Sequence, residues 1–185
     1  MDSKAIVKIS RSRGQIFMLG FCVCLLPLSV SNRQVKVPKE VEARERVETI
    51  MRETLKRGEG EIIIDGIKSK ITRRAMPSLE DAKEVRDYGD AGIEALARYL
   101  HSENPREQDL AIRFLGLIGG SRIVEPLEQI IRYDPSPNIR EVALRAITQA
   151  PWDLASVILR EASESDPDPK IRKVSKELLM DYAPK

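Results

Sequence analysis

Apolar positions in the C-terminal half of the chain recur every 32 residues. Pro105, Pro137 and Pro169 are separated by this interval, and each is followed five residues later by an aliphatic residue. Two more rows keep the same spacing: Ala111, Ala143 and Ser175, and Leu115, Ile147 and Leu179. A prolyl turn followed by the same apolar positions in each unit is typical of a helical solenoid. The pattern therefore predicts helix pairs that stack side by side.

Within each unit, the apolar spacing predicts the helices and their inward faces. We expect helix pairs at about 78–101, 105–132 and 137–164, and a closing helix at 169–182. Ser78 and Ser121 precede apolar runs, so each is expected to cap the helix that follows. The expected core includes Leu79, Ala82, Val85 and Tyr88 in the first pair, and Leu154, Val157, Ile158 and Leu159 in the third. Neither helix of a pair can bury its apolar face alone, so stacking must supply the core.

Two shorter elements precede the repeats. Residues 38–58 place Val41, Val47 and Ile50 near one face, which predicts an amphipathic helix. In residues 60–73 an Asp-Gly pair separates two β-branched runs, which predicts a β-hairpin. Lone hairpins are marginal in water, so this one is expected to cover the apolar end of the first helices or to pair with a partner. The predicted fold is all-α, a short right-handed α-solenoid preceded by a helix and a small hairpin.

Residues 1–31 have the pattern of a secretory signal peptide. A basic start is followed by an uncharged apolar stretch, 16–30, and by Ser29-Val30-Ser31, a small-x-small cleavage pattern. A cleaved signal is the favoured interpretation, and a retained membrane anchor or a buried helix are the alternatives. Residues 32–37 are predicted to be a linker. The protein is expected to be exported, periplasmic or extracellular, or else anchored to the membrane by this segment.

Composition narrows the function classes. Removal of residues 1–31 leaves 27 of the 31 basic and 28 of the 29 acidic side chains, a net charge of −1. A near-neutral chain lacks the basic excess that favours nucleic acid as a partner. Both cysteines, Cys22 and Cys24, fall in the apolar stretch, so the remaining chain can form no disulfide and no thiolate metal site.

Residues 111–127 resemble a HEAT repeat of the short type named after phycobilisome lyases. The run contains Leu115-Gly116, an apolar-glycine turn at Ile118-Gly119 and Pro126-Leu127, as that family does. Residues 134–143 and 166–174 resemble the family's inter-repeat turn and the start of its next helix. The resemblance covers about 105 of the 185 residues, and it implies an α-solenoid that binds other proteins. The turn departs from the family's pattern at Gly120-Ser121 and again at Gln149 to Asp153. These departures leave open whether aspartate and arginine form a ladder along the stack.

Residues that carry catalytic chemistry are scarce in this sequence. The only histidine, His101, falls at a predicted helix C-terminus, where the helix dipole favours it. Glu161, Glu164, Asp166 and Asp168 lack the spacing of a calcium loop and are expected to form a solvated helix end. We therefore predict no catalytic, metal or cofactor site and no small-molecule substrate.

The second helices of such stacks usually line the concave side, so their polar positions are the predicted partner-binding surface. Trp152, at an inter-helix turn, is either a buried wedge or an exposed interface anchor. The predicted surface consists of Arg98, Glu125, Glu128, Gln129, Arg132, Trp152, Ser156 and Arg160. Its mixed charges favour a protein over a polyanion as the partner.

Three hypotheses of function follow from the sequence. The leading one is an exported, non-catalytic scaffold that binds a protein. The second is a membrane-tethered structural solenoid. The third is an enzyme, either a lyase-like accessory that acts on a prosthetic group or a HEAT-like glycosylase. The absence of thiols and of a basic excess after residue 31 counts against it.

Overall fold

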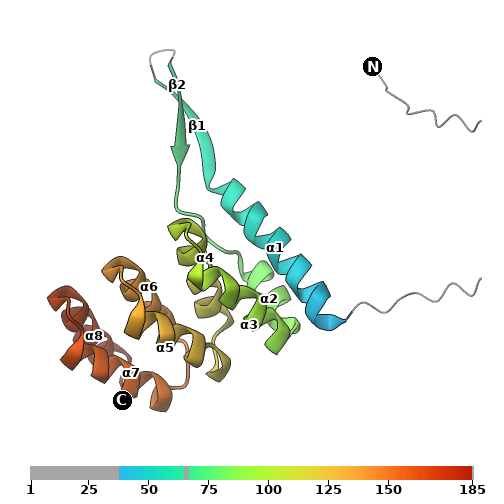
Figure 1. Cartoon of the computed structure of the whole chain (residues 1–185). Coiled ribbons are helices and arrows are strands. Elements are labelled where there is room, and N and C mark those ends of the chain that lie inside the picture. The colour runs from blue at the N-terminus through green and yellow to red at the C-terminus, as the bar shows by residue number, and fades with distance from the viewer. Residues whose placement is uncertain (1–37, 65–66, 185) are drawn as a thin grey trace, which may run out of the picture. The chain divides into compact units, whose positions relative to one another are not determined.

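The computed structural model describes residues 38–64 and 67–184. The predicted signal peptide, 1–31, and linker, 32–37, lie outside the described residues. Among those described, the chain begins with helix α1 (Lys39–Arg57) and a hairpin of strands β1 (Glu59–Ile64) and β2 (Ile67–Thr72), and continues with helices only (Figure 1). The helices are α2 (Leu79–Asp87), α3 (Asp90–Ala97), the 3-10 helix η1 (Arg98–His101), α4 (Pro105–Ile118), the 3-10 helix η2 (Ser121–Ile123), α5 (Val124–Tyr133), α6 (Pro137–Ile147), α7 (Trp152–Ser165) and α8 (Pro169–Tyr182).

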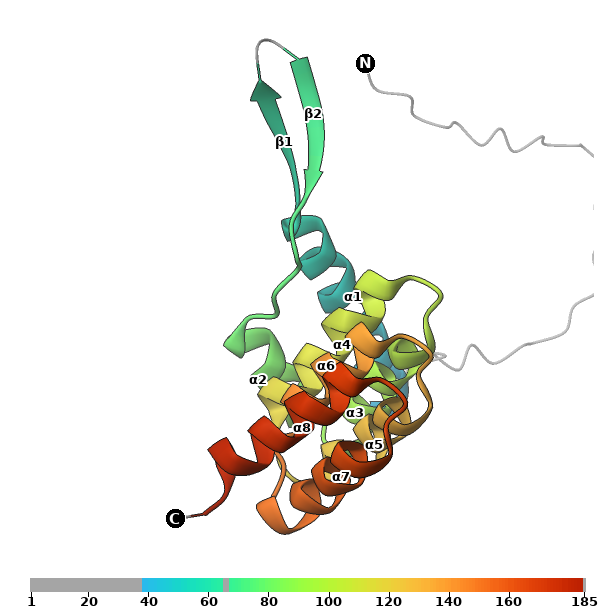
Figure 2. The same ribbon diagram turned by 90° about the vertical axis from the view of Figure 1, so that its left-hand side faces the viewer.

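The helices stack in chain order, as the 32-residue period predicts. The prolines of the period each occupy the first turn of a first helix, α4, α6 or α8, where the missing N–H costs no hydrogen bond. First helices pack on first helices, α4 on α6 and α6 on α8, and α5 packs on α7 (Figure 2). The predicted all-α solenoid is confirmed.

The core is the seam between successive pairs, and both of its ends are closed. Leu110, Leu115 and Ile147 are fully buried in it. Helix α1 covers the N-terminal end, where it packs on α3 through its buried face. At the other end, Lys176 occupies the position that Leu144 holds one repeat earlier, and it is exposed where Leu144 is buried. A charged side chain at this position ends the stack, because a further pair would have to bury it.

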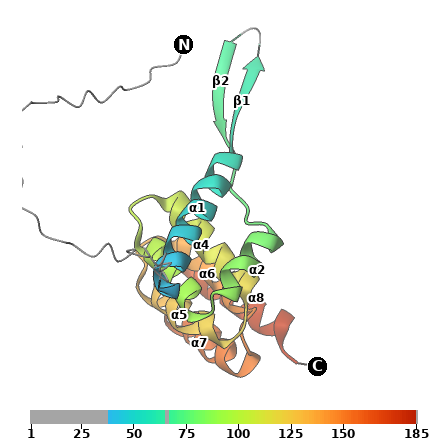
Figure 3. The same cartoon turned by 90° about the vertical axis from the view of Figure 1, so that its right-hand side faces the viewer.

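The hairpin extends away from the helices beyond the end of α1 (Figures 1 and 3). Its strands are antiparallel, with Glu59 opposite Thr72 and Ile64 opposite Ile67. The alternative in which the hairpin covers the first helices is therefore wrong, since α1 fills that role. The predicted Asp-Gly turn lies outside the described residues.

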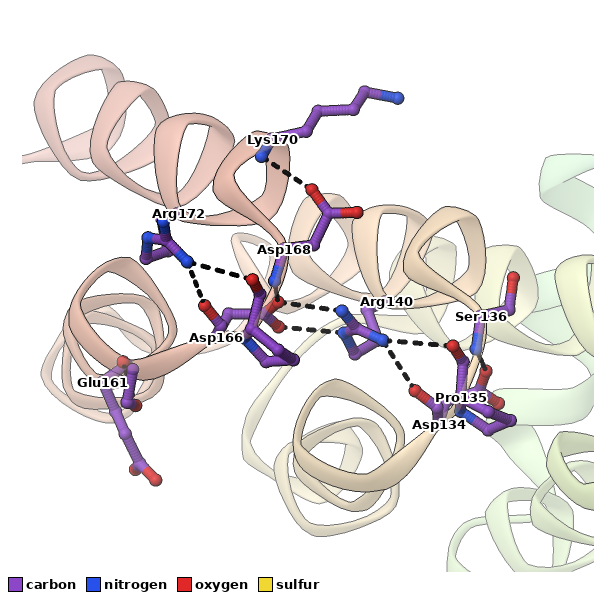
Figure 4. Close-up of polar contacts among 11 residues, drawn as sticks. Asp134, Pro135, Ser136, Arg140, Glu161, Asp166, Asp168, Lys170 and Arg172 are labelled. Atoms are coloured by element: carbon purple, nitrogen blue, oxygen red, sulfur yellow. Dashed lines mark hydrogen bonds and ion pairs between the residues drawn. The ribbon is translucent and has the colours of Figure 1, made fainter.

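An aspartate–arginine ladder runs along the inter-repeat turns (Figure 4). Arg140 in α6 donates two hydrogen bonds to Asp166 in the next turn, at 2.9 and 2.8 Å, and a third to the backbone oxygen of Asp134 at 2.9 Å. Gln108 replaces arginine one repeat earlier and donates to Asp134. Arg172, one repeat later, donates to the backbone oxygens of Asp166 and Pro167. Of the ladder that the sequence left open, one aspartate–arginine side-chain pair is present, Arg140 with Asp166. The prediction of a solvated end at Asp166 is wrong because this carboxylate is buried.

Four predicted inward residues are instead exposed. Leu79, in the first turn of α2, is 74% exposed, and Val157 in α7 is 62% exposed. Val41 and Leu154 are also exposed, because Ala43 and Ala155 take the inward positions on their helices.

Ser78 caps α2 as predicted, accepting a hydrogen bond from the amide of Asp81 at 3.0 Å. The predicted cap at Ser121 is wrong: no side-chain cap bond forms, and this residue begins η2.

Candidate functional site

A continuous groove lies between the segment that joins β2 to α2 and the first helices α4 and α6. It has two halves, of about 650 and 610 Å³, which share Arg113, Val142 and Arg145 in their linings. The joining segment, residues 72–79, forms one wall, and the exposed faces of α4 and α6 form the other. We call the hollow of about 650 Å³, which is lined by six basic residues, the basic half. We call the hollow of about 610 Å³, which includes Met76, Leu79 and Leu117, the apolar half.

The close approach of the joining segment to α1 positions this wall. The amide of Arg73 donates to the backbone oxygen of Gly58 at 2.7 Å, and Ala75 is buried beside it. A Cβ on residue 58 would lie 2.9 Å from the Arg73 oxygen and 3.4 Å from the Ala75 Cα. Glycine at the end of α1 therefore allows the segment to turn back and to pass along the first helices.

The basic half carries more positive than negative side chains. Among the residues whose side chains the structure describes, two acids, Asp109 and Glu141, line it together with six basic residues. The basic residues are Arg73, Arg74, Arg106, Arg113, Arg145 and Lys170. Such an excess attracts carboxylates or phosphates into the groove.

Several of these cations are already paired. Arg113 binds Asp109 at 2.8 Å, and Glu141 accepts from both Lys170 at 2.7 Å and Arg145 at 3.0 Å. The hydrogen bonds from Lys170 and Arg145 lower the pKa of Glu141 below its ordinary value. Glu141 therefore stays ionised at neutral pH and holds the two basic side chains on the wall of the groove.

Other cations retain unused donors. Arg73 and Arg74 are exposed, and neither forms an ion pair with an acidic residue whose side chain the structure describes, in 38–60 and 72–184. Arg106 lies 3.5 Å from Glu59 through its Nη1, while its buried Nη2 has no acceptor in the described part of the chain. The groove thus presents arginine N–H groups that can bind further carboxylate oxygens.

The apolar half exposes large aliphatic side chains at its rim. Met76 is 60% exposed, and Leu79 and Leu117 are exposed beside it. Between them lie Gly116 and Ala146, which bring α4 and α6 close together: a Cβ on residue 116 would be 3.1 Å from the Ala146 Cβ. Small residues in the floor and long residues at the rim make a shallow apolar depression.

The second-helix surface predicted from the sequence lies elsewhere on the molecule. Its members occupy η1, α5 and α7, and Arg98, Glu125, Gln129 and Arg160 are exposed. Glu128 and Ser156 are partly exposed. Trp152 is also partly buried, between the two alternatives left open, and packs against the core at the start of α7.

Arg132 connects two of the second helices. It binds Glu128 on its own helix and Glu161 on α7, both at 2.7 Å. It also lines a small groove of about 190 Å³ between α5 and α7. The structure thus ties Arg132, with Glu128, into a contact between repeats and leaves Arg98, Glu125 and Arg160 exposed to solvent.

Sequence reasoning missed the groove because its walls come from three separate parts of the chain. The sequence features that mark this wall are the Arg73-Arg74 pair and the Met76-Pro77 dipeptide before α2. Neither belongs to a periodic pattern. In the described residues no group of three or more histidine, cysteine or acidic side chains is arranged to hold a metal ion. The chemistry available to the groove is binding through charge and apolar contact.

Comparison with known proteins supplies a family. A family model described as HEAT repeats matches residues 84–180, which is more than half of the chain. No curated protein and no solved structure matches the chain. Across the described residues, none of the helices has both the length and the apolar character needed to span a membrane.

Proposed function

Because the chain belongs to the HEAT-repeat family, we propose that it is an exported, non-catalytic scaffold that binds a partner protein. HEAT repeats are commonly protein-interaction scaffolds. The observation that carries the proposal is the continuous groove along α4 and α6, with arginine donors in one half and exposed Met76, Leu79 and Leu117 in the other.

The location rests on the sequence of the N-terminal segment. A basic start, an uncharged stretch at 16–30 and a small-x-small pattern at 29–31 support export with cleavage. N-terminal sequencing of the protein from cells tests this directly. A start near Asn32 supports a cleaved signal, and an intact Met1 supports the alternative of a membrane-tethered solenoid.

The non-catalytic role rests on side-chain chemistry. After residue 31 the chain has one histidine and no cysteine, so it offers no thiol and a single imidazole for handling a prosthetic group. The lyase-like role that the phycobilisome-lyase resemblance implies therefore has less support than a scaffold.

Site-specific photocrosslinking in the producing cells tests whether, and where, a partner binds. A photoreactive residue would replace Leu117 at the groove, Gln129 on the second-helix surface, or Lys176 at the closed end of the stack. We expect a crosslinked protein at position 117, a second one at 129 if the sequence-predicted surface is also used, and none at 176. Equal labelling at all three positions, or none at 117 and 129, would contradict the scaffold proposal.

A further inference from the structure

We propose that the groove binds an acidic, amphipathic peptide segment of the partner, with its carboxylates in the basic half and its apolar side chains in the apolar half. This proposal rests on the scaffold function and names the chemistry of the segment recognised. Its first support is charge: of the described side chains that line the basic half, six are basic and two are acidic. The two acids are held by Arg113, Arg145 and Lys170, so Arg73 and Arg74 are left to bind external carboxylates.

The second support is the continuity of the two halves. Each half alone is about the size of a small-ligand site, which spans roughly 300–1,000 Å³. Because Arg113, Val142 and Arg145 line both halves, the halves adjoin, and one ligand can extend from the first into the second. A peptide segment with acidic and apolar side chains has the length and the two kinds of chemistry that this requires.

The apolar half distinguishes a peptide from a polyanion. Nucleic acid presents phosphates along its whole length, so a strand that filled the groove would place charged phosphates against the apolar half. Met76 and Leu79 would then stay exposed, with no apolar group against them. An acidic peptide matches both halves and buries these side chains.

The chain's own N-terminal segment does not have the required charge. The charged residues of the stretch 32–37 are Arg33 and Lys36, both basic. A basic segment would be repelled by Arg73 and Arg74. The charge of the groove therefore favours an acidic segment of another protein over this stretch of the chain.

Fluorescence anisotropy with the purified full chain tests the proposal. The probe is a labelled peptide of about 15 residues in which glutamate pairs alternate with leucines, compared with versions that carry glutamine or lysine in place of glutamate. We expect the glutamate peptide to bind, the glutamine version to bind about tenfold more weakly, and the lysine version not to bind. Binding should weaken as salt rises, because exposed charges are screened.

Two variants address the two halves separately. Arg73→Glu with Arg74→Glu should weaken binding of the glutamate peptide about tenfold or more, and Met76→Ser with Leu79→Ser should weaken it several-fold. The matched control is Lys83→Glu with Lys176→Glu, which changes the net charge equally at exposed positions outside the groove. All six side chains are exposed, so we expect every variant to fold. Circular dichroism of each variant checks this.

Further measurements test other occupants of the groove. The proposal would be overturned if a single-stranded oligonucleotide, or vesicles containing anionic lipid, bound more tightly than the peptide. It would also be overturned by equal binding of the peptide to the groove variants and to the control, or by light scattering that shows the groove variants abolishing a dimer. Absence of peptide binding together with a crosslink at position 117 would refute the acidic segment and leave the scaffold function standing.

Discussion

The guanidinium of Arg140 and the carboxylate of Asp166 form a two-point hydrogen bond between consecutive repeats, with side chains that are only 8% and 4% exposed. Asp166 also accepts from the amide of Asp168 at 2.8 Å, and Arg140 also donates to the backbone of the preceding turn. Each charge therefore has hydrogen-bonding partners from the protein in a site that is almost fully buried. This pair joins the end of α7 to α6.

Replacement of Arg140 by alanine should destabilise the protein by about 3–5 kcal/mol, because it leaves the buried Asp166 carboxylate without a counter-charge. Urea denaturation followed by circular dichroism measures the loss. The matched control is Arg145→Ala on the same helix. Its pair with Glu141 is partly exposed, with the arginine side chain 59% exposed, so we expect a loss within about 1 kcal/mol. Equal losses in the two variants would mean that the ladder adds nothing to ordinary surface pairing.

The 32-residue period predicted the helices because the apolar positions that repeat along the sequence are the positions at which successive helices pack. Pro105, Pro137 and Pro169 each fall in the first turn of a first helix, and the buried positions follow from that register. The exceptions have local causes. Leu79 begins α2 at the rim of the groove, where the joining segment covers only part of the helix, and a helical spacing cannot signal that.

The groove was beyond sequence reasoning because no periodic pattern describes the path of residues 72–79. That path depends on the hairpin leaving α1, on the contact between Gly58 and Arg73, and on α4 and α6 lying close enough to share a floor. The second-helix surface, in contrast, was predicted by geometry alone from the repeat. It stays a prediction, to be tested beside the groove by the photoreactive residue at position 129.

Replacement of Gly58 by alanine should move the joining segment. The new Cβ would lie 2.9 Å from the Arg73 oxygen, and backbone atoms on both sides limit the relief, so we expect a loss of about 1–3 kcal/mol. Amide hydrogen exchange should become faster at Arg73 and its neighbours. The control Gly120→Ala has open space around its Cβ but a φ of +81° with a ψ of −177°, a conformation that essentially only glycine adopts, so it should lose about 1–3 kcal/mol from backbone strain without affecting the segment. Unchanged exchange at Arg73 in Gly58→Ala would contradict the role given to this glycine.

Glu84 makes the contact between α1 and α2 sensitive to acid. It forms a two-point pair with Arg46, whose Nη2 lies 2.9 Å from its Oε2, and the hydrogen bonds from Arg46 lower the pKa of Glu84 below 4.5. As the pH falls past 4.5, the unfolded chain takes up a proton before the folded one does. The stability that this pair provides is therefore fully present above about pH 4.5 and is lost as the pH falls through the folded pKa.

Glu84→Gln should accordingly be slightly less stable than the parent at pH 7, by up to about 1 kcal/mol since both side chains are partly exposed. It should also lose less stability than the parent between about pH 5.5 and pH 3. Thermal unfolding across this range measures both effects. Glu80→Gln, on the same helix at an exposed position without a basic partner in the described residues, should follow the parent curve. If Glu84→Gln and the parent lose stability in parallel, the pair does not contribute to the acid sensitivity.

The single tryptophan makes it possible to follow the last repeats separately. Trp152 packs partly against the core at the start of α7, while far-UV circular dichroism reports on all helices. Since repeats contact chiefly their neighbours, a cut in the ladder should let α7 and α8 unfold before the rest. In Asp166→Ala we expect the fluorescence midpoint in urea to fall below the circular dichroism midpoint by roughly 1 M, given a loss of several kcal/mol and a typical dependence on urea. Arg46→Ala, which weakens the opposite end, should not move the fluorescence midpoint below that of circular dichroism. Coincident transitions in Asp166→Ala would show that the stack unfolds as one unit, and that the buried pair stabilises the whole solenoid instead of joining its last two helices to the remainder.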